Sequence, residues 1–92
     1  MPLMNGGAAI VESMLAQGVK TVFGLPGGQL YHLYNAYLQA GDRLQVITSR
    51  HEQGAAYMAY GYSAATGGVG VYSVVPGPGL LNTTAALLTA YG

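Results

Sequence analysis

The stretch LQVITSRHEQGAAYMAYGYSAATGGVGVYSVVPGPG, residues 44–79, predicts a strand, a helix and a second strand in that order. Residues 44–49 form a short run rich in β-branched side chains, and residues 69–75 have the same character. Between them, residues 50–67 contain many alanines and end at Gly67. Because glycine accepts positive φ angles, it commonly ends helices. The stretch therefore predicts one strand–helix–strand unit of a parallel sheet.

The same alternation continues on both sides of this unit. Residues 19–24, VKTVFG, predict a further strand. Apolar residues recur at helical spacing over residues 10–15 and 30–38, and residues 80–91 predict a last helix. Short apolar strands that alternate with helices favour an α/β fold in which helices cover both faces of a parallel sheet. This is a three-layer α/β/α arrangement.

Three turns follow the expected strands at equal intervals. They contain Pro26, His51 and Pro76, which are 25 residues apart. Right-handed crossovers bring the carboxyl ends of parallel strands to one edge of the sheet, and ligands of open α/β sheets bind at that edge. We therefore expect one cluster of turns, at residues 25–28, 50–53 and 76–79.

The composition argues against several classes of partner. The 92-residue chain has 7% charged residues, a formal net charge of zero and no cysteine. It lacks the basic charge that attracts nucleic acid or an anionic membrane, and it cannot form disulfides. None of its apolar runs approaches the roughly 18 residues of a membrane span. We expect a cytoplasmic protein, and because 51% of its residues are hydrophobic, we expect a homo-oligomer that buries surface between copies.

Common catalytic and nucleotide-binding motifs are incomplete in this chain. GPGLLN, residues 77–82, lacks the third glycine of a dinucleotide-binding turn, and neither glycine-rich turn ends as a P-loop does. The second histidine of an H-E-x-x-H zinc motif would fall at Ala55, so we expect no metal site. No serine lies in a G-x-S-x-G nucleophile elbow. Taken alone, the glycine-rich turns are explained by backbone geometry.

Glu52 is the one carboxylate among the three turns, and two interpretations of it are open. An acidic residue in a first helical turn gains about 0.3–1 kcal/mol from the helix dipole. Alternatively, small residues after it, such as Gly54 and Gly61, let a ligand approach closely, at a cost of about 1 kcal/mol per glycine relative to alanine. In that case we expect burial to raise the pKa of Glu52, so that it shares a proton with a ligand nitrogen.

Three segments at matching spacing resemble a known family: VFGLPGG (22–28), RHEQGAAYMAYGYSAATG (50–67) and VVPGPGLLN (74–82). They are similar to the N-terminal pyrimidine-binding domain of thiamine-diphosphate-dependent enzymes, in the group of acetolactate synthase, benzoylformate decarboxylase and glyoxylate carboligase. The resemblance implies the strand order 2-1-3. It also implies that Glu52 hydrogen-bonds N1′ of the cofactor's aminopyrimidine and so promotes removal of the thiazolium C2 proton. The residues that match cofactor-binding positions are Pro26, Gly27, Gly28, Glu52, Pro78 and Asn82.

The resemblance also defines what we expect of the whole protein. The family's domain is longer than this chain, so residues 1–92 are expected to form the N-terminal half of a pyrimidine-binding domain. The Mg²⁺ that accompanies thiamine diphosphate would bind in a separate carboxyl-terminal domain, and the cofactor would lie at a subunit interface. We expect the chain to be part of a 2-keto acid decarboxylase or carboligase and to be inactive alone.

Two other functions remain open from the sequence. The chain could be a flavodoxin-like module that binds another small ligand, in which case Glu52 only compensates the helix dipole. It could also be a non-catalytic fragment whose alanine- and tyrosine-rich helix faces associate with copies of the chain.

Overall fold

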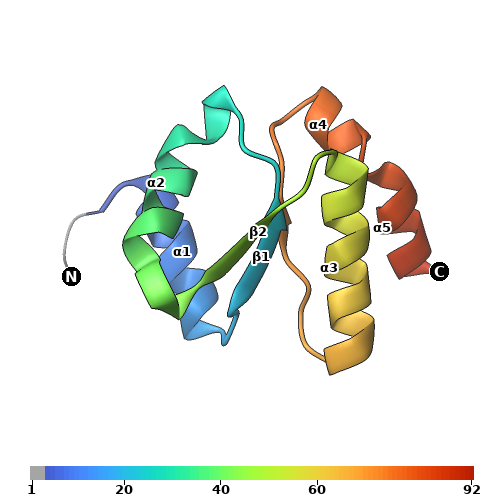
Figure 1. The fold of residues 1–92 in the computed structure, drawn as a ribbon, viewed down its shortest axis with the longest axis horizontal. Helices are drawn as coiled ribbons and strands as arrows, with labels where there is room; N and C mark the ends of the chain where they lie inside the picture. Colours follow the sequence, from blue (N-terminus) through green and yellow to red (C-terminus); the bar gives the residue numbers. More distant parts are fainter. Residues whose placement is uncertain (1–3) are drawn as a thin grey trace.

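Three parallel strands and their connecting helices make up the computed structural model, which describes residues 4–92 (Figure 1). The strands are β1 (Thr21–Gly24), β2 (Gln45–Thr48) and β3 (Tyr72–Ser73). The helices are α1 (Gly6–Ala16), α2 (Tyr31–Ala40), α3 (Glu52–Thr66), α4 (Pro78–Leu81) and α5 (Thr84–Tyr91), with the short 3₁₀ helices η1 (Gly28–Leu30) and η2 (Gly41–Arg43). Helices α1 and α2 cover one face of the sheet, and α3 covers the other with α5 beside it.

The strand order is β2-β1-β3, with both pairs parallel. In the register, Val22 lies opposite Val46, and Phe23 lies opposite Ile47 on one side and Tyr72 on the other. The predicted α/β/α fold and the order 2-1-3 are therefore confirmed. Because all three strands run in one direction, their carboxyl ends share one edge of the sheet.

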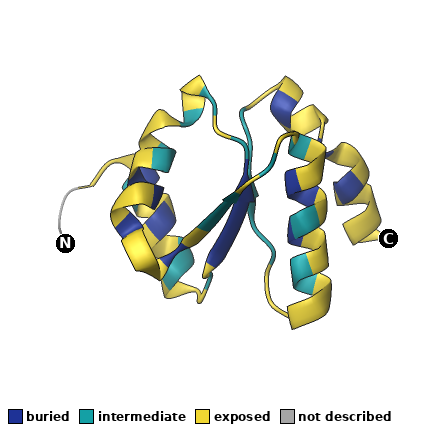
Figure 2. Ribbon diagram, viewed as in Figure 1, coloured by how far each residue is buried: buried dark blue, intermediate teal, exposed yellow. Residues whose placement is uncertain are grey.

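The core has two parts, one on each face of the central strand β1. Successive side chains of a strand point to opposite faces. Val22 accordingly packs with buried residues of α1 and α2, whereas Phe23 packs with Ala55 and Ala59 of α3. Figure 2 shows β1 buried along its length and the buried residues of α1, α2 and α3 turned toward it. The sheet therefore holds both helical layers through one four-residue strand.

Two of the predicted helix ends lie at glycines in the left-handed region. Gly41 has a φ of 58° after α2, and Gly67 has a φ of 75° after α3, where its N–H donates to the Ser63 carbonyl. Glycine takes these angles without the penalty that a Cβ imposes. The sequence pattern located both ends because it depends on this local property.

The last predicted helix, residues 80–91, is wrong as a single element. The chain forms two helices, α4 and α5, that are separated at Asn82 and Thr83. Helix α4 begins earlier than predicted, because Pro78 has the φ angle of a first helical residue. It ends where the Thr83 hydroxyl and N–H both donate to the Leu80 carbonyl, at 2.6 and 2.9 Å.

The third strand is shorter than the predicted residues 69–75. Only Tyr72 and Ser73 form β3, which lies at the sheet edge with β1 as its single neighbour among the described strands. Residues before it pass under α3, where a Cβ on Gly70 would collide with the carbonyl oxygen of Ala59. This close passage separates the segment from the ladder.

Gly7 and Gly6 provide a test of the packing between α1 and α2. A Cβ on Gly7 would lie 2.5 Å from the His32 carbonyl oxygen and 2.9 Å from the Leu33 nitrogen, which are backbone atoms. We expect Gly7→Ala to lower the free energy of unfolding by about 1–3 kcal/mol, because α2 must move. Gly6→Ala meets no atom within 4 Å and should leave stability unchanged or slightly raised. Urea unfolding of both variants measures this, and equal stabilities would contradict the packing described.

Candidate functional site

The three turns after the strands meet at the carboxyl edge of the sheet, as predicted. The Leu25 N–H donates to the Ser73 carbonyl at 3.2 Å, and the Ser49 N–H donates to the Gly24 carbonyl at 2.8 Å. These bonds extend the strand pairing beyond the strand ends and hold the first turn between the other two. The start of α3 and the whole of α4 lie at this edge (Figure 1).

The N-terminus of α3 is fixed by a side-chain cap. His51 is the N-cap residue, and its Nδ1 accepts a hydrogen bond from the Gln53 N–H at 3.1 Å. The Ser49 hydroxyl donates to the His51 carbonyl at 2.7 Å. Because Nδ1 is an acceptor, the His51 imidazole is neutral with its proton on Nε2. The cap makes Glu52 the first helical residue and places its carboxylate at the positive end of the helix dipole.

Asn82 binds Glu52 directly. The Asn82 side-chain amide donates from Nδ2 to Glu52 Oε1 at 3.1 Å, so that α4 lies against the start of α3. Pro78 begins α4 and Asn82 caps its C-terminus. Two residues that the sequence assigned to cofactor binding, 30 positions apart, therefore meet in the structure.

The hydrogen bond from Asn82 lowers the pKa of Glu52 below its ordinary value, and the backbone N–H donors of the helix terminus add to this effect. Desolvation acts in the opposite direction and is smaller, because the Glu52 side chain remains partly exposed. The expectation that burial raises the pKa of Glu52 is therefore wrong for this chain. A depressed pKa in the folded state adds stability above the ordinary pKa, and that stability is lost as pH falls through the folded value.

Val75 joins the first turn to α4. A Cβ on Gly79 would lie 2.7 Å from Val75 Cγ2, and a Cβ on Gly27 would collide with Val75 Cγ1. The two methyl groups of Val75 thus rest on two glycines from different turns. The Gly79 position is also 3.6 Å from Glu52 Oε2. Glycine is needed at both positions because the chains approach this closely.

The other residues of the first turn line a separate cavity. Its volume is about 470 Å³, and it opens beside α2. Glu52 and Asn82 are not among its lining residues, which are Pro26, Gly27, Gly28, Tyr31, Tyr34, Asn35 and Leu38. The structure therefore brings Glu52, Gly79 and Asn82 together, and connects Gly27 to them through Val75. Pro26 and Gly28 lie on the far side of that turn.

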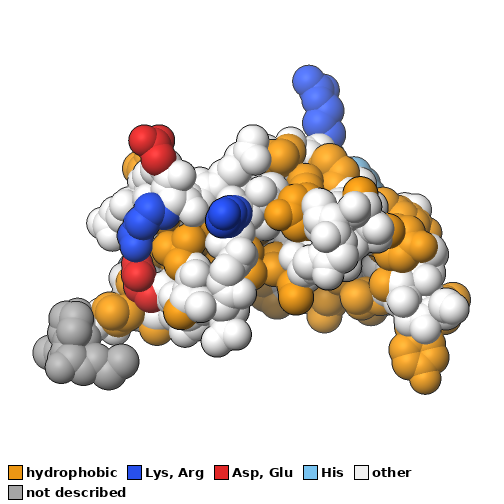
Figure 3. Space-filling model, turned by 90° about the horizontal axis from the view of Figure 1, so that it is seen from below, with side chains coloured by type: hydrophobic (Ala, Val, Ile, Leu, Met, Phe, Trp, Pro, Cys, Tyr) orange, Lys and Arg blue, Asp and Glu red, His pale blue; other side chains and the backbone are white. Residues whose placement is uncertain are grey.

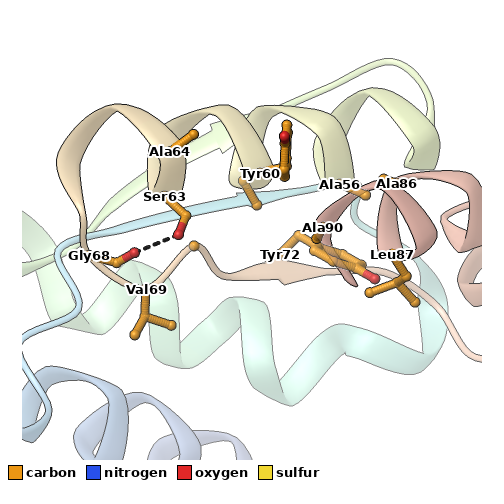
Figure 4. Close-up of a pocket in the computed structure, with 12 residues that line it drawn as sticks. Ala56, Tyr60, Ser63, Ala64, Gly68, Val69, Tyr72, Ala86, Leu87 and Ala90 are labelled. Carbon is orange, nitrogen blue, oxygen red and sulfur yellow. Dashed lines mark hydrogen bonds between the residues drawn. The ribbon is translucent and has the colours of Figure 1, made fainter. Parts of the chain in front are cut away.

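A second cavity, of about 440 Å³, lies between α3 and α5 (Figure 4). Its lining consists of small, apolar and hydroxyl-bearing side chains, including Ala56, Ser63, Ala64, Tyr72 and Leu87. It holds no charged side chain and so offers no acid or base. The sequence interpretation linked the small residues of α3 to a ligand beside Glu52. The structure shows that several of them line this cavity or pack on the sheet instead.

Charge is distributed unevenly over the chain. Every Asp, Glu, Lys and Arg precedes Gln53. Figure 3 shows charged side chains over the α1 and α2 part of one face and hydrophobic side chains toward the α5 end. Leu88 and Tyr91 of α5 are 72% and 92% exposed.

Residues 4–92 contain no helix that is both long and apolar enough to cross a membrane. Within the same part of the chain, no three His, Cys, Asp or Glu side chains are grouped so that they could hold a metal ion.

Comparison with known proteins gives a family and several relatives. A family model described as "Thiamine pyrophosphate enzyme, N-terminal TPP binding domain" matches residues 4–92. The chain is 44% identical over 91 residues to the acetolactate synthase isozyme 3 large subunit of Escherichia coli, and 41% identical over 91 residues to the acetolactate synthase large subunit of Buchnera aphidicola; each match covers 99% of this chain and 16% of the relative. It is 40% identical over 88 residues to a probable 2-ketoarginine decarboxylase of Pseudomonas aeruginosa, covering 96% of this chain and 15% of the relative. The chain thus spans about one sixth of the length of these relatives.

Asn82→Ala tests the electrostatic account of Glu52. Removal of the amide donor should raise the pKa of Glu52 toward its ordinary value, because Asn82 is the largest cause of the depression. A carboxyl ¹³C titration by NMR measures this pKa. Asn35→Ala, which removes an amide in the first-turn cavity, is the control and should leave the pKa of Glu52 in place. An unchanged Glu52 titration in the Asn82 variant would overturn the account.

Proposed function

The chain belongs to the thiamine pyrophosphate enzyme family, in its N-terminal TPP-binding domain, and from this premise we propose that residues 1–92 form the N-terminal half of the pyrimidine-binding domain of a 2-keto acid decarboxylase or carboligase. The observation that carries the proposal is the hydrogen bond from Asn82 to Glu52, which joins two expected cofactor residues. The names of the relatives, acetolactate synthases and a probable 2-keto acid decarboxylase, support the substrate class.

The residues at the carboxyl edge fit an aminopyrimidine. Oε1 of Glu52 is occupied by Asn82, while Oε2 accepts no hydrogen bond from the described residues and can receive an N–H of a ligand. Gly79 leaves the adjacent space without a side chain. We propose that Glu52, Gly79, Asn82 and the turn of Pro26, Gly27, Gly28 and Pro78 hold the pyrimidine ring. When bound, thiamine diphosphate supplies an acidic carbon and an electron sink for decarboxylation.

Glu52 would act as the proton-holding group of this site. Asn82 and the helix terminus keep it ionised while it is exposed to water, ready to accept a hydrogen bond from a ring nitrogen. When ligand and further protein cover the carboxylate, loss of water favours its neutral form and raises its pKa. Its affinity for a proton then approaches that of a ring nitrogen, which makes transfer between them easier.

The remaining parts of the proposal concern the whole protein. We place the Mg²⁺ and diphosphate site in a separate carboxyl-terminal domain, and the cofactor between subunits of a cytoplasmic homo-oligomer. The exposed apolar side chains of α5, such as Leu88 and Tyr91, favour contact with further protein. The same surface favours the second candidate function, a non-catalytic chain that associates with its own copies.

Glu52→Gln in the complete enzyme that we propose contains this chain tests the role of the carboxylate. Glutamine keeps the size of the side chain and an acceptor oxygen, but it does not share a proton with a ring nitrogen. We expect exchange of the C2 proton of bound thiamine diphosphate to slow by roughly 10²- to 10⁴-fold. NMR after quenched exchange in D₂O measures the rate without knowledge of the keto acid.

Glu12→Gln is the matched control for this experiment. Glu12 is an exposed carboxylate that forms an ion pair with Arg43 at 3.1 Å, on the α1 and α2 side of the sheet. Its variant should exchange at the wild-type rate. If Glu52 only compensates the helix dipole, its variant loses at most about 1 kcal/mol of stability and also exchanges at the wild-type rate. That result would refute the proposed function.

A further inference from the structure

A buried hydroxyl pair lies directly behind Asn82. Thr83 is 0% exposed and occupies the junction between α4 and α5. Its Oγ1 lies 3.0 Å from the phenol oxygen of Tyr72 on β3, and 2.6 Å from the Leu80 carbonyl oxygen. Figure 4 shows the Tyr72 side chain extending from β3 toward α5.

The direction of these hydrogen bonds follows from the number of protons. A threonine hydroxyl has one proton, and here the Leu80 carbonyl can only accept it. The Tyr72 phenol must therefore donate to Thr83 Oγ1 in the other bond. The result is a directed chain from Tyr72 through Thr83 to the last turn of α4. Each group in it has one satisfactory role, which fixes the junction relative to the sheet.

This chain ends one residue from the Asn82 amide. Asn82 is exposed, and Glu52 is the partner of its side-chain amide among the described residues. Little packing therefore holds the Asn82 side chain, and its position depends on the backbone at the end of α4. That backbone is held by Thr83, whose N–H and hydroxyl both donate to Leu80. A valine would fill the same volume as Thr83 but would lack the link to Tyr72.

We propose that Tyr72 and Thr83 are positioning residues, whose hydrogen bond holds the junction of α4 and α5 so that the Asn82 amide meets Glu52. They touch neither the carboxylate nor the expected ligand, and they act through Asn82. The claim about geometry stands on this chain alone. Its importance for proton transfer rests on the function proposed above.

The test compares Thr83→Val, Thr83→Ser and Tyr72→Phe in the full chain without cofactor. Two NMR readouts are taken: the ¹⁵N–¹H shifts of the Asn82 side-chain amide and the titration of the Glu52 carboxyl. Thr83→Val and Tyr72→Phe should change the amide shifts and raise the pKa of Glu52 toward its ordinary value. Thr83→Ser keeps the hydroxyl and should restore both readouts to those of the wild type.

A second hydroxyl pair on the same helices supplies the control. Tyr57 of α3 and Thr89 of α5 lie 3.2 Å apart through their oxygens, and neither adjoins Asn82. Tyr57→Phe and Thr89→Val should leave the Asn82 and Glu52 signals unchanged, even where they lower the melting temperature. A general loss of stability is thereby separated from a loss of position.

The outcome that overturns the proposal is an unchanged Glu52 titration in a folded Tyr72→Phe or Thr83→Val variant. Tyr72→Phe keeps the hydrogen bond from Thr83 to Leu80, so it remains informative if Thr83→Val does not fold. These readouts need no cofactor. If they shift as expected while Glu52→Gln leaves C2 proton exchange intact in the enzyme, the positioning role stands and the proposed function fails.

Discussion

The common direction of the three strands is the constraint on which the site depends. Strand β1 is hydrogen-bonded on both sides by strands that run parallel to it, so each strand ends at the same edge. The turn after each strand then has to share that edge with the other two. Glu52 and Asn82 meet there because one begins the helix after β2 and the other ends the helix after β3. Neither residue could reach the other if one strand were reversed.

Close approach of backbone and side chain makes this edge compact. Val75 rests on Gly27 and Gly79, and Gly79 in turn adjoins Glu52. The glycines therefore serve packing between turns as well as turn geometry. The electrostatic state of Glu52 follows from the same arrangement, since one amide donor and the helix terminus outweigh a modest desolvation. A carboxylate in this state is ready to bind a proton-bearing nitrogen and becomes a stronger base once it is covered.

Patterns of period and spacing predicted the fold and the cluster of turns. The β-branched runs located β1 and β2, and the glycines after α2 and α3 located their ends, because each of these signals is local. The break at Thr83 was not predicted, since LLNTTAALLTAY has continuous helical character and the break depends on one hydroxyl and its partner on another strand. The direction of the Glu52 pKa shift was also missed, because the sequence does not show which donor reaches the carboxylate or how much water surrounds it. The small residues of α3 served packing and a cavity beside α5, which the helical pattern alone could not distinguish from a ligand surface.

The central claim is that the carboxyl edge, and no other surface of this chain, receives thiamine diphosphate. An amide chemical-shift titration of the isotopically labelled protein with thiamine diphosphate tests it most directly. The account predicts that the largest shifts occur at Gly27, at Gly79 and at the side-chain amide of Asn82. Shifts concentrated at Ser63 and Val69, in the cavity between α3 and α5, would contradict it.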